Sequence, residues 1–209
     1  YRLDRPLKPE GSLAVLKGNL APEGATIKKS AVADDMQVHQ GPARVFDSER
    51  EAVDALLAKH IRPGDVVVIR YQGPRATGMP EMFFMSELIA SDPVLSHTTS
   101  LVTDGRFSGA TRGPCVGYLG PEALDGGPIA LIQDDDLILV DIPRRRLDIV
   151  GIGGREMPEE EIRKVLEERR RHWRRPVIRH KGVLGQYTRL ALPALQGASS
   201  AHGALGAEA

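Results

Sequence analysis

Hydrophobic residues recur at helical spacing in residues 47–60. Ala52 and Leu56 are four residues apart, as are Val53 and Leu57, and charged residues separate them. Apolar positions three and four residues apart lie on one face of an α-helix. The pattern therefore predicts an amphipathic helix with one apolar face toward a core.

Helix start signals precede this segment and a more charged one near the C-terminus. Asp47 or Ser48 can cap the first helix with a side-chain oxygen. Pro158 opens the second, EEEIRKVLEERRRHW, and proline is favoured in a first helical turn. Its narrow apolar stripe predicts contact with the core along one edge only; the stripe consists of Ile162, Val165, Leu166, Arg169 and Trp173. Residues 81–90 predict a further helix.

Short apolar runs predict the strands. Residues 66–70, VVVIR, are apolar and β-branched and predict a buried strand, with the next at residues 99–102. Residues 11–29 alternate short apolar stretches with Gly and Pro, which indicates loops and brief strands. Three more short strands are expected, joined by DDD and PRRR turns into a meander, at residues 131–132, 137–142 and 147–150.

Length and composition favour a single domain. The chain has 209 residues, of which 41% are hydrophobic, enough for one sizeable core. We expect residues 1–193 to form this domain. Residues 194–209 are almost wholly Ala, Gly, Ser and Leu, which predicts a flexible tail. The chain opens on Tyr1 rather than Met, so we expect a fragment of a longer protein.

Charge and cysteine content narrow the classes of partner. Lys plus Arg and Asp plus Glu number 28 each, so no global field attracts nucleic acid or an anionic membrane. No apolar run approaches the roughly 20 residues of a membrane span. The single Cys115 allows no internal disulfide and no four-thiol metal set. A cytoplasmic protein is the expected class.

The loop at residues 103–114, TDGRFSGATRGP, contains the main candidates for chemistry. It combines three Gly, two Arg, two Thr, one Asp and one Ser directly after a predicted strand. Glycine lets backbone N–H groups approach an anion, and α/β folds place ligands at the carboxyl ends of strands. The loop is either a carboxylate-binding site or a structural Gly-rich turn.

A second candidate segment, GPRATGMPEM at residues 73–82, also follows a strand. Glu81 lies near a predicted helix start, where a carboxylate interacts favourably with the helix dipole. The same carboxylate is a hard oxygen donor of the kind that Mg²⁺ prefers. Both interpretations of Glu81 remain open from spacing alone.

Several blocks in this order resemble a known family. They are GSLAVLKGNLAPEGATIKKSAV, GPARVFDSEREAVDALL, RPGDVVVIRYQGPRATGMPEM, TDGRFSGATRGPCVGYLGPEALDGGPIALIQDDDLILVDIP and RRRLDIV. Together they resemble the C-terminal region of the dihydroxy-acid dehydratase and phosphogluconate dehydratase family. The resemblance runs from about Gly11 to Val150, with a looser echo in GVLGQYTRLALPAL.

The resemblance implies roles for residues of both loops. It implies that Ser108 acts as an alkoxide base on the C2 proton of the substrate, and that Glu81 is a magnesium ligand. An unassisted hydroxyl is a poor base, so this role requires a neighbouring metal charge. Asp104, Gly105 and Arg106 are expected to shape the loop. Gly109, Ala110 and Thr111 are expected to line a pocket for the substrate carboxylate.

The resemblance also implies a fold, cofactors and partners. The expected fold is mixed β/α, a swivelling β/β/α domain with a β-barrel-like core and surrounding helices. The expected cofactors are Mg²⁺ and an iron–sulfur cluster, 2Fe-2S or 4Fe-4S, whose ligands belong to an N-terminal domain absent from this chain. The fragment alone is therefore expected to be inactive, and the whole enzyme to be a homodimer.

The implied reaction removes water from a 2,3-dihydroxy acid to form a 2-oxo acid in branched-chain amino acid biosynthesis. The short form of GPRATGMPEM is more like sugar-acid dehydratases, whereas SGATRGPCVGYLGPEALDGGPIALIQDDD is closer to the branched-chain type. An aldonate or phosphogluconate dehydratase is therefore the alternative. A non-catalytic binding domain that kept the fold is a third hypothesis.

Overall fold

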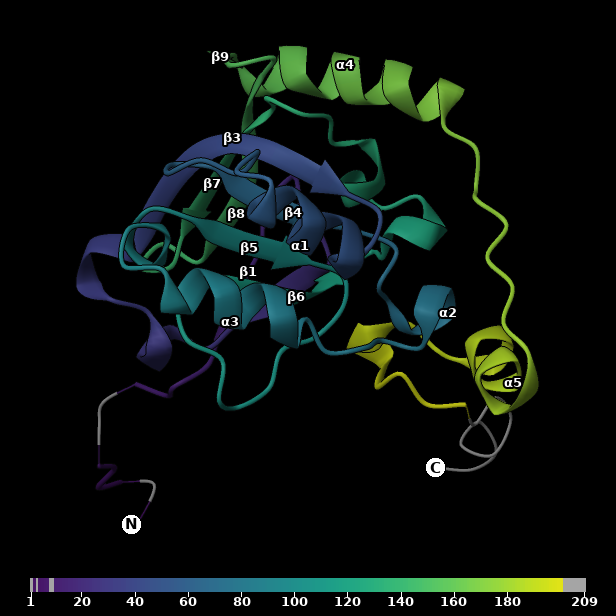
Figure 1. Ribbon diagram of the computed structural model, residues 1–209, viewed down its shortest axis with the longest axis horizontal. Helices are drawn as coiled ribbons and strands as arrows, with labels where there is room; N and C mark the ends of the chain where they lie inside the picture. The colour runs from purple at the N-terminus through teal and green to yellow at the C-terminus, as the bar shows by residue number, and fades with distance from the viewer. Residues whose placement is uncertain (1, 3, 8–9, 201–209) are drawn as a thin grey trace.

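The computed structural model describes residues 2, 4–7 and 10–200 and centres on one nine-stranded sheet (Figure 1). The strand order is β1-β2-β6-β5-β4-β3-β7-β8-β9. Neighbouring strands run parallel from β3 to β6 and antiparallel elsewhere. The strands are β1 (Ala14–Leu16), β2 (Gly24–Ile27), β3 (Val38–Phe46), β4 (Val66–Ile69), β5 (Ser100–Thr103), β6 (Cys115–Gly120), β7 (Leu137–Asp141), β8 (Arg146–Ile152) and β9 (Arg155–Glu156).

The sheet curls until the segment after β1 meets β8. The Lys17 N–H donates to the Arg145 carbonyl at 2.9 Å, and the Leu147 N–H donates to the Lys17 carbonyl at 3.0 Å. Asn19 continues this contact with its side chain: Nδ2 donates to the Ile149 carbonyl at 2.9 Å, and Oδ1 accepts from the Ile149 N–H at 2.7 Å. The prediction of a mixed β/α fold with a curled, barrel-like sheet is thus confirmed.

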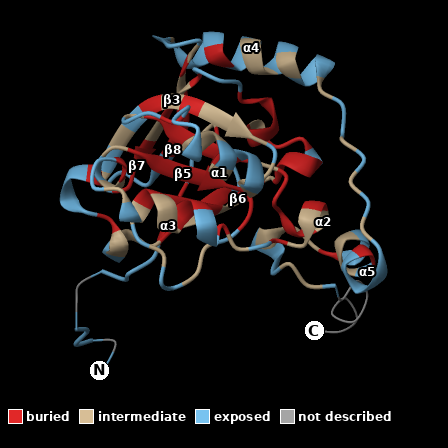
Figure 2. Cartoon of the chain, viewed as in Figure 1, coloured by how far each residue is buried: buried red, intermediate tan, exposed pale blue. Residues whose placement is uncertain are grey.

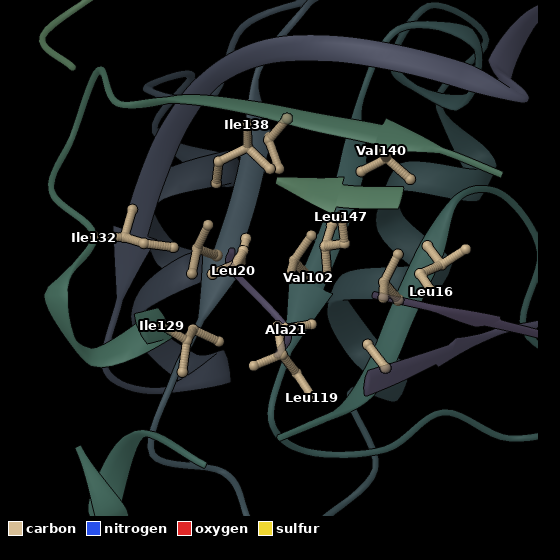
Figure 3. Close-up of a cluster of buried hydrophobic side chains, with 14 of the residues drawn as sticks. Leu16, Leu20, Ala21, Val102, Leu119, Ile129, Ile132, Ile138, Val140 and Leu147 are labelled. Atoms are coloured by element: carbon tan, nitrogen blue, oxygen red, sulfur yellow. The ribbon is translucent and has the colours of Figure 1, made fainter. Parts of the chain in front are cut away.

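Both faces of the central strands β4 and β5 are buried, so side chains that alternate between the two faces all enter a core. Val66 and Val68 of β4 point into the inner core, which fills the curl of the sheet. Figure 3 shows part of this core, including Leu16, Val102 and Leu147. Val67 of β4 belongs instead to a second core on the outer face. The continuous apolar runs of the sequence follow from this double burial.

Two helices cover the outer face. α1 (Glu49–Leu57) and α3 (Phe83–Ser91) supply Ala52, Met85 and Ile89 to the outer core. Ser48 caps α1 by accepting from the Glu51 N–H at 3.2 Å, as the sequence predicts. In Figure 2 these helices are buried on the side facing the strands and exposed on the other.

The charged helix α4 (Glu159–His172) packs along one edge, as predicted from its narrow apolar stripe. Ile162 is its buried residue. The guanidinium of Arg169 forms an ion pair with the fully buried carboxylate of Asp136, and the Trp173 indole donates to the Tyr71 hydroxyl at 3.1 Å. The short helices α2 (Pro74–Thr77) and α5 (Gly182–Leu190) lie together at another end of the molecule (Figure 1).

The prediction of a strand at residues 131–132 is wrong. This segment ends a 3₁₀ helix, Pro128–Leu131, and both Leu131 and Ile132 are buried. Their apolar character reflects packing into the core rather than pairing in a ladder, a distinction that a two-residue run cannot reveal. The strands predicted at 137–142 and 147–150 are confirmed as β7 and β8.

The sequence also conceals β3, the longest strand. Its interior contains Gly41 and Pro42, residues that normally argue against a strand. The structure gives the reason, since β3 changes partner at this point: residues 38–42 pair with β7 and residues 43–46 with β4. A Cβ added at Gly41 would lie 1.9 Å from the Gly64 carbonyl oxygen, so this close approach requires glycine.

Residues 194–200 of the expected tail are folded against the domain. A 3₁₀ turn forms at Ala194–Gln196, and the Tyr187 hydroxyl donates to the Ala198 carbonyl at 2.7 Å. The flexibility predicted for residues 201–209 falls outside the described residues. Within the described part of the chain, no helix combines the length and apolar character needed to cross a bilayer.

Closure of the sheet should depend on Asn19. In Asn19→Ala the N–H and C=O of Ile149 lose their side-chain partners, so we expect the free energy of unfolding to fall by about 2 kcal/mol. Chemical denaturation followed by circular dichroism measures this loss. Gln40→Ala, which removes one exposed hydrogen bond to Glu156, is the control and should cost less than about 0.5 kcal/mol. Equal losses in the two variants would contradict the role of Asn19.

Candidate functional site

The two candidate loops leave the sheet side by side. β4 and β5 are parallel neighbours, so the loops after their carboxyl ends emerge at the same edge. The Met82 N–H donates to the Arg106 carbonyl at 3.1 Å, and Arg106 Nε donates to the Met79 carbonyl at 2.9 Å. The structure therefore brings together GMPEM and TDGRFSG, which are more than 20 residues apart in the chain.

The buried side chain of Asp104 connects the loops of the site to one another. Its side chain is fully buried, with Oδ1 accepting from the Gln72 N–H and Oδ2 from the Ala123 N–H, each at 2.8 Å. Gln72 follows β4, Asp104 follows β5 and Ala123 follows β6. Burial raises the pKa of Asp104 to about 6, although the hydrogen bonds from backbone amides oppose the rise. One carboxyl group thus joins the loops after three adjacent strands.

Gly105 and Arg106 extend the same network. The Gly105 N–H donates to Thr103 Oγ1 at 2.9 Å, and its carbonyl accepts from the Tyr118 N–H at 2.8 Å. A Cβ at Gly105 would lie 3.0 Å from the Gln72 Cβ, so the packing leaves little room for a side chain. The Arg106 guanidinium lies 3.8 Å from the Glu81 carboxylate. Hydrogen bonds and one ion pair therefore hold the Glu81 loop and the Ser108 loop against each other.

Ser108 lies beside a cavity of about 360 Å³. The residue is half-buried, and its hydroxyl accepts from the Ala110 N–H at 3.1 Å. The cavity is lined by Leu13, Thr26, Lys28, Phe107, Ser108, Gly109, Thr111, Gly113, Cys115 and Tyr118. Of the predicted pocket residues, Gly109 and Thr111 line this cavity, whereas Ala110 contributes its N–H to Ser108 instead.

Lys28 is a polar residue of the cavity that sequence analysis misses. It directly follows β2, which pairs antiparallel with β6 on the far side of the loop. Its Nζ donates to the Gly109 carbonyl. The segment GATIKK contains no motif that would mark this lysine, and Ser108 is 80 positions away in the chain. Only the pairing of β2 with β6 places the ammonium group next to the loop.

Glu81 is suited to a metal ion as a single ligand. Its side chain is about a quarter exposed, at 27%, and lies 3.8 Å from the Arg106 guanidinium; among the described residues it forms no hydrogen bond. Within the described residues, no group of three or more His, Cys, Asp or Glu side chains gathers to hold a metal ion. A magnesium ion at Glu81 would therefore need further ligands from outside these residues.

Cys115 is buried in the outer core, and its Sγ donates to the Arg112 carbonyl at 3.5 Å. Burial raises the pKa of its thiol to about 12. Thiolates rather than thiols bind metals and iron–sulfur clusters. The residue is therefore a small buried member of the core and does not fit a cluster ligand.

Glu122, after β6, is a second buried carboxyl group that sequence analysis does not single out. It is 2% exposed and accepts from the Arg75 N–H at 3.3 Å. Burial, together with the neighbouring carboxyls of Asp104 and Asp125, raises its pKa to about 8, although Arg75 opposes the rise. The group lies next to Asp104 and beneath the same loops. Its protonation state therefore changes the charge beside the buried Asp104 carboxyl group.

Comparisons with known proteins show the family to which the chain belongs. The family model described as dihydroxy-acid/6-phosphogluconate dehydratase C-terminal matches residues 1–198. The dihydroxy-acid dehydratase of Acetivibrio thermocellus is 49% identical over 198 residues, or 94% of this chain and 34% of that protein. Those of Methanothrix thermoacetophila and Archaeoglobus fulgidus are 48% and 47% identical over 197 residues, with 93% and 94% of this chain and 34% of each relative covered. The chain thus spans about a third of the length of these relatives.

The buried carboxyl group of Glu122 should make stability depend on pH. Its pKa is raised in the folded state, so the folded protein retains a proton that the unfolded chain releases. The contribution of Glu122 to stability is therefore fully present below about pH 4.5 and is lost as pH rises through about 8, by at most about 1.4 kcal/mol per pH unit.

Glu122→Gln should remove this decline, so that the variant gains stability relative to the wild type as pH rises from 5 to 8. Urea denaturation at several pH values measures the slope. Glu167→Gln, at an exposed position on α4, should leave it unchanged. A Glu122→Gln slope equal to that of the wild type would contradict the assignment.

Proposed function

The chain belongs to the C-terminal dihydroxy-acid/6-phosphogluconate dehydratase family, and from this premise we propose that it is the C-terminal part of a hydro-lyase. The whole enzyme would convert a 2,3-dihydroxy acid into a 2-oxo acid with loss of one water. The supporting observation is the position of Ser108 on a cavity wall, in a loop bonded to the loop of Glu81.

A dihydroxy-acid substrate of the branched-chain type is favoured over a sugar acid. The relatives that match most of this chain are named dihydroxy-acid dehydratases, with identities of 46–49%. The short GPRATGMPEM loop favours a sugar acid, but it comprises only ten residues. The matches to dihydroxy-acid dehydratases cover most of the chain. Apolar lining residues such as Leu13 and Phe107 also suit a substrate with an alkyl group. We therefore place the enzyme in branched-chain amino acid biosynthesis.

In the proposed reaction the Ser108 alkoxide takes the proton from C2 of the substrate. The C2 electron pair forms a double bond to C3, and the C3 hydroxyl takes the proton now on Ser108 and departs as water, which restores the alkoxide. The resulting enol gains a proton at C3 and loses the proton of its C2 hydroxyl to become the 2-oxo acid. The Ala110 N–H, which already donates to Ser108 Oγ, stabilises negative charge on that oxygen. Gly109 and Thr111 line the space where the acid would bind.

Glu81 is the residue of this chain that would hold Mg²⁺. When bound, the ion supplies positive charge that lowers the pKa of nearby hydroxyl groups and polarises substrate oxygens. Arg106 positions the Glu81 carboxylate, and the paired loops keep Glu81 on the same side of the sheet as Ser108. The remaining magnesium ligands would come from an N-terminal domain.

An iron–sulfur cluster does not fit the residues of this chain, because Cys115 is its one thiol and is buried. Any cluster would be held by an N-terminal domain, either as 2Fe-2S or as 4Fe-4S. The relatives' greater length leaves room for such a domain. We further propose that the present domain has the swivelling β/β/α fold and that the whole enzyme is a cytoplasmic homodimer. The fragment alone would then be inactive.

The retained site argues against a non-catalytic module that has only kept the fold. A binding module has no need for a serine hydroxyl that borders a cavity and accepts a backbone hydrogen bond. It also has no need for the neighbouring Glu81 carboxylate. The proposed catalytic role uses both.

Ser108→Ala should abolish turnover in the complete enzyme. We expect kcat for a 2,3-dihydroxy acid to fall at least about 10³-fold, since the base is lost, while the visible absorption of any bound cluster stays unchanged. Initial-rate measurements of 2-oxo acid formation test this. Ser91→Ala, at an exposed position at the end of α3, should retain wild-type rates. Near wild-type turnover by Ser108→Ala would refute the proposed base.

Glu81→Gln should weaken magnesium binding. An amide is a neutral and poorer ligand than a carboxylate, so we expect the Mg²⁺ concentration for half-maximal activity to rise about 10-fold to 100-fold. Titration of the metal-depleted complete enzyme with Mg²⁺ measures the shift. Glu87→Gln removes a nearby carboxylate on α3 that pairs with Arg112 and should not change it. An unchanged requirement in Glu81→Gln would exclude Glu81 as a ligand.

A further inference from the structure

The cavity beside Ser108 has an unusual balance of charge. Lys28 is the one residue with a formally charged side chain among the ten that line it, and no Asp or Glu is among them. The hydroxyl-bearing residues Thr26, Thr111 and Tyr118 also line the cavity. An ammonium group beside hydroxyl-bearing residues, with no carboxylate among the lining residues, provides complementary charge for an anion.

Lys28 differs in this respect from the lysine next to it. Lys29 forms an ion pair with Glu10. Lys28 has no carboxylate within ion-pair distance among the described residues, and its recorded partner is the neutral carbonyl of Gly109. An ammonium group has three N–H donors, so the contact with Gly109 leaves two free for a ligand. The positive charge of Lys28 is therefore not neutralised within the described structure.

We propose that Lys28 binds the carboxylate of the hydroxy-acid substrate in the Ser108 cavity. The inference rests on the proposed function and adds the group that recognises the acid. Gly109, which holds the ammonium, is the residue directly after Ser108. In a 2-hydroxy acid the carboxylate carbon is bonded to C2, so fixing the carboxylate at Lys28 keeps C2 close to the serine that removes its proton. Lys28 thus orients the substrate.

A structural role for Lys28 is the competing explanation. Its bond to the Gly109 carbonyl alone could fasten the loop, and the loop would then be disturbed when Lys28 is replaced. The two roles predict different kinetics. If Lys28 binds the carboxylate, its replacement weakens the binding of acids and leaves uncharged ligands unaffected. If Lys28 only holds the loop, its replacement lowers kcat for the substrate and weakens charged and uncharged ligands alike.

The test compares Lys28→Gln, Lys28→Arg and the control Lys29→Gln in the complete protein that contains this chain. For Lys28→Gln we expect KM for a 2,3-dihydroxy acid to rise about 10-fold to 100-fold with kcat within about threefold of wild type. Lys28→Arg keeps the charge and should recover most of the affinity. Lys29→Gln should behave as the wild type.

A pair of inhibitors isolates the charge. A short 2-hydroxy carboxylate and its uncharged carboxamide are compared as competitive inhibitors, and Lys28→Gln should reduce the preference for the carboxylate about 10-fold or more. An unchanged preference in Lys28→Gln would overturn the proposal, as would equal losses of kcat in the Gln and Arg variants.

Failure of the proposed function gives a different result. A wild-type protein that dehydrates no hydroxy acid would refute the hydro-lyase activity, whatever Lys28 does. Calorimetric titration with the same carboxylate and carboxamide still tests the binding role in that case. Carboxylate binding that depends on Lys28 would support the anion site alone, and wild-type protein that does not distinguish the two compounds would overturn it.

Discussion

The carboxyl group of Asp104 is the contact on which the candidate site depends. It is fully buried, and its two oxygens accept backbone N–H groups from the loops after β4 and β6. Burying a carboxyl group costs free energy, which is reflected in a pKa raised to about 6. The hydrogen bonds offset part of this cost and fix the ends of three neighbouring strands relative to one another. The loop that contains Ser108 begins at this anchor.

The strand order determines which other residues reach that loop. Parallel pairing of β4 and β5 places the Glu81 and Ser108 segments at one edge, and Arg106 links them through backbone and side chain. Antiparallel pairing of β2 with β6 brings Lys28 from the start of the chain to the opposite side of the same loop. The cavity is thus formed by residues from two directions. The segment after β2 contributes the ammonium group of Lys28, and the loop after β5 contributes the hydroxyl group of Ser108.

Burial affects the ionisation of two groups near the site. Burial raises the pKa of Glu122 and of Cys115, so both groups favour their neutral forms. Glu122 lies beneath the loops of the site, and Cys115 belongs to the outer core. Lys28 instead lines the cavity beside Ser108, and Glu81 lies in the neighbouring loop with its side chain 27% exposed. These two charged residues therefore come from opposite sides of the loop that contains Ser108.

Much of the fold and part of the site follow from the sequence alone. Local signals identify α1 with its Ser48 cap, the buried strand β4 and the edge-packed helix α4, because periodicity and capping act between residues close in the chain. The Gly-rich loop with Ser108 is recognisable for the same reason. The switch of partners along β3 and the position of Lys28 were decided only by the tertiary structure. Both depend on which strands pair across the sheet, and that pairing is set by contacts between distant segments that leave no local pattern in the sequence.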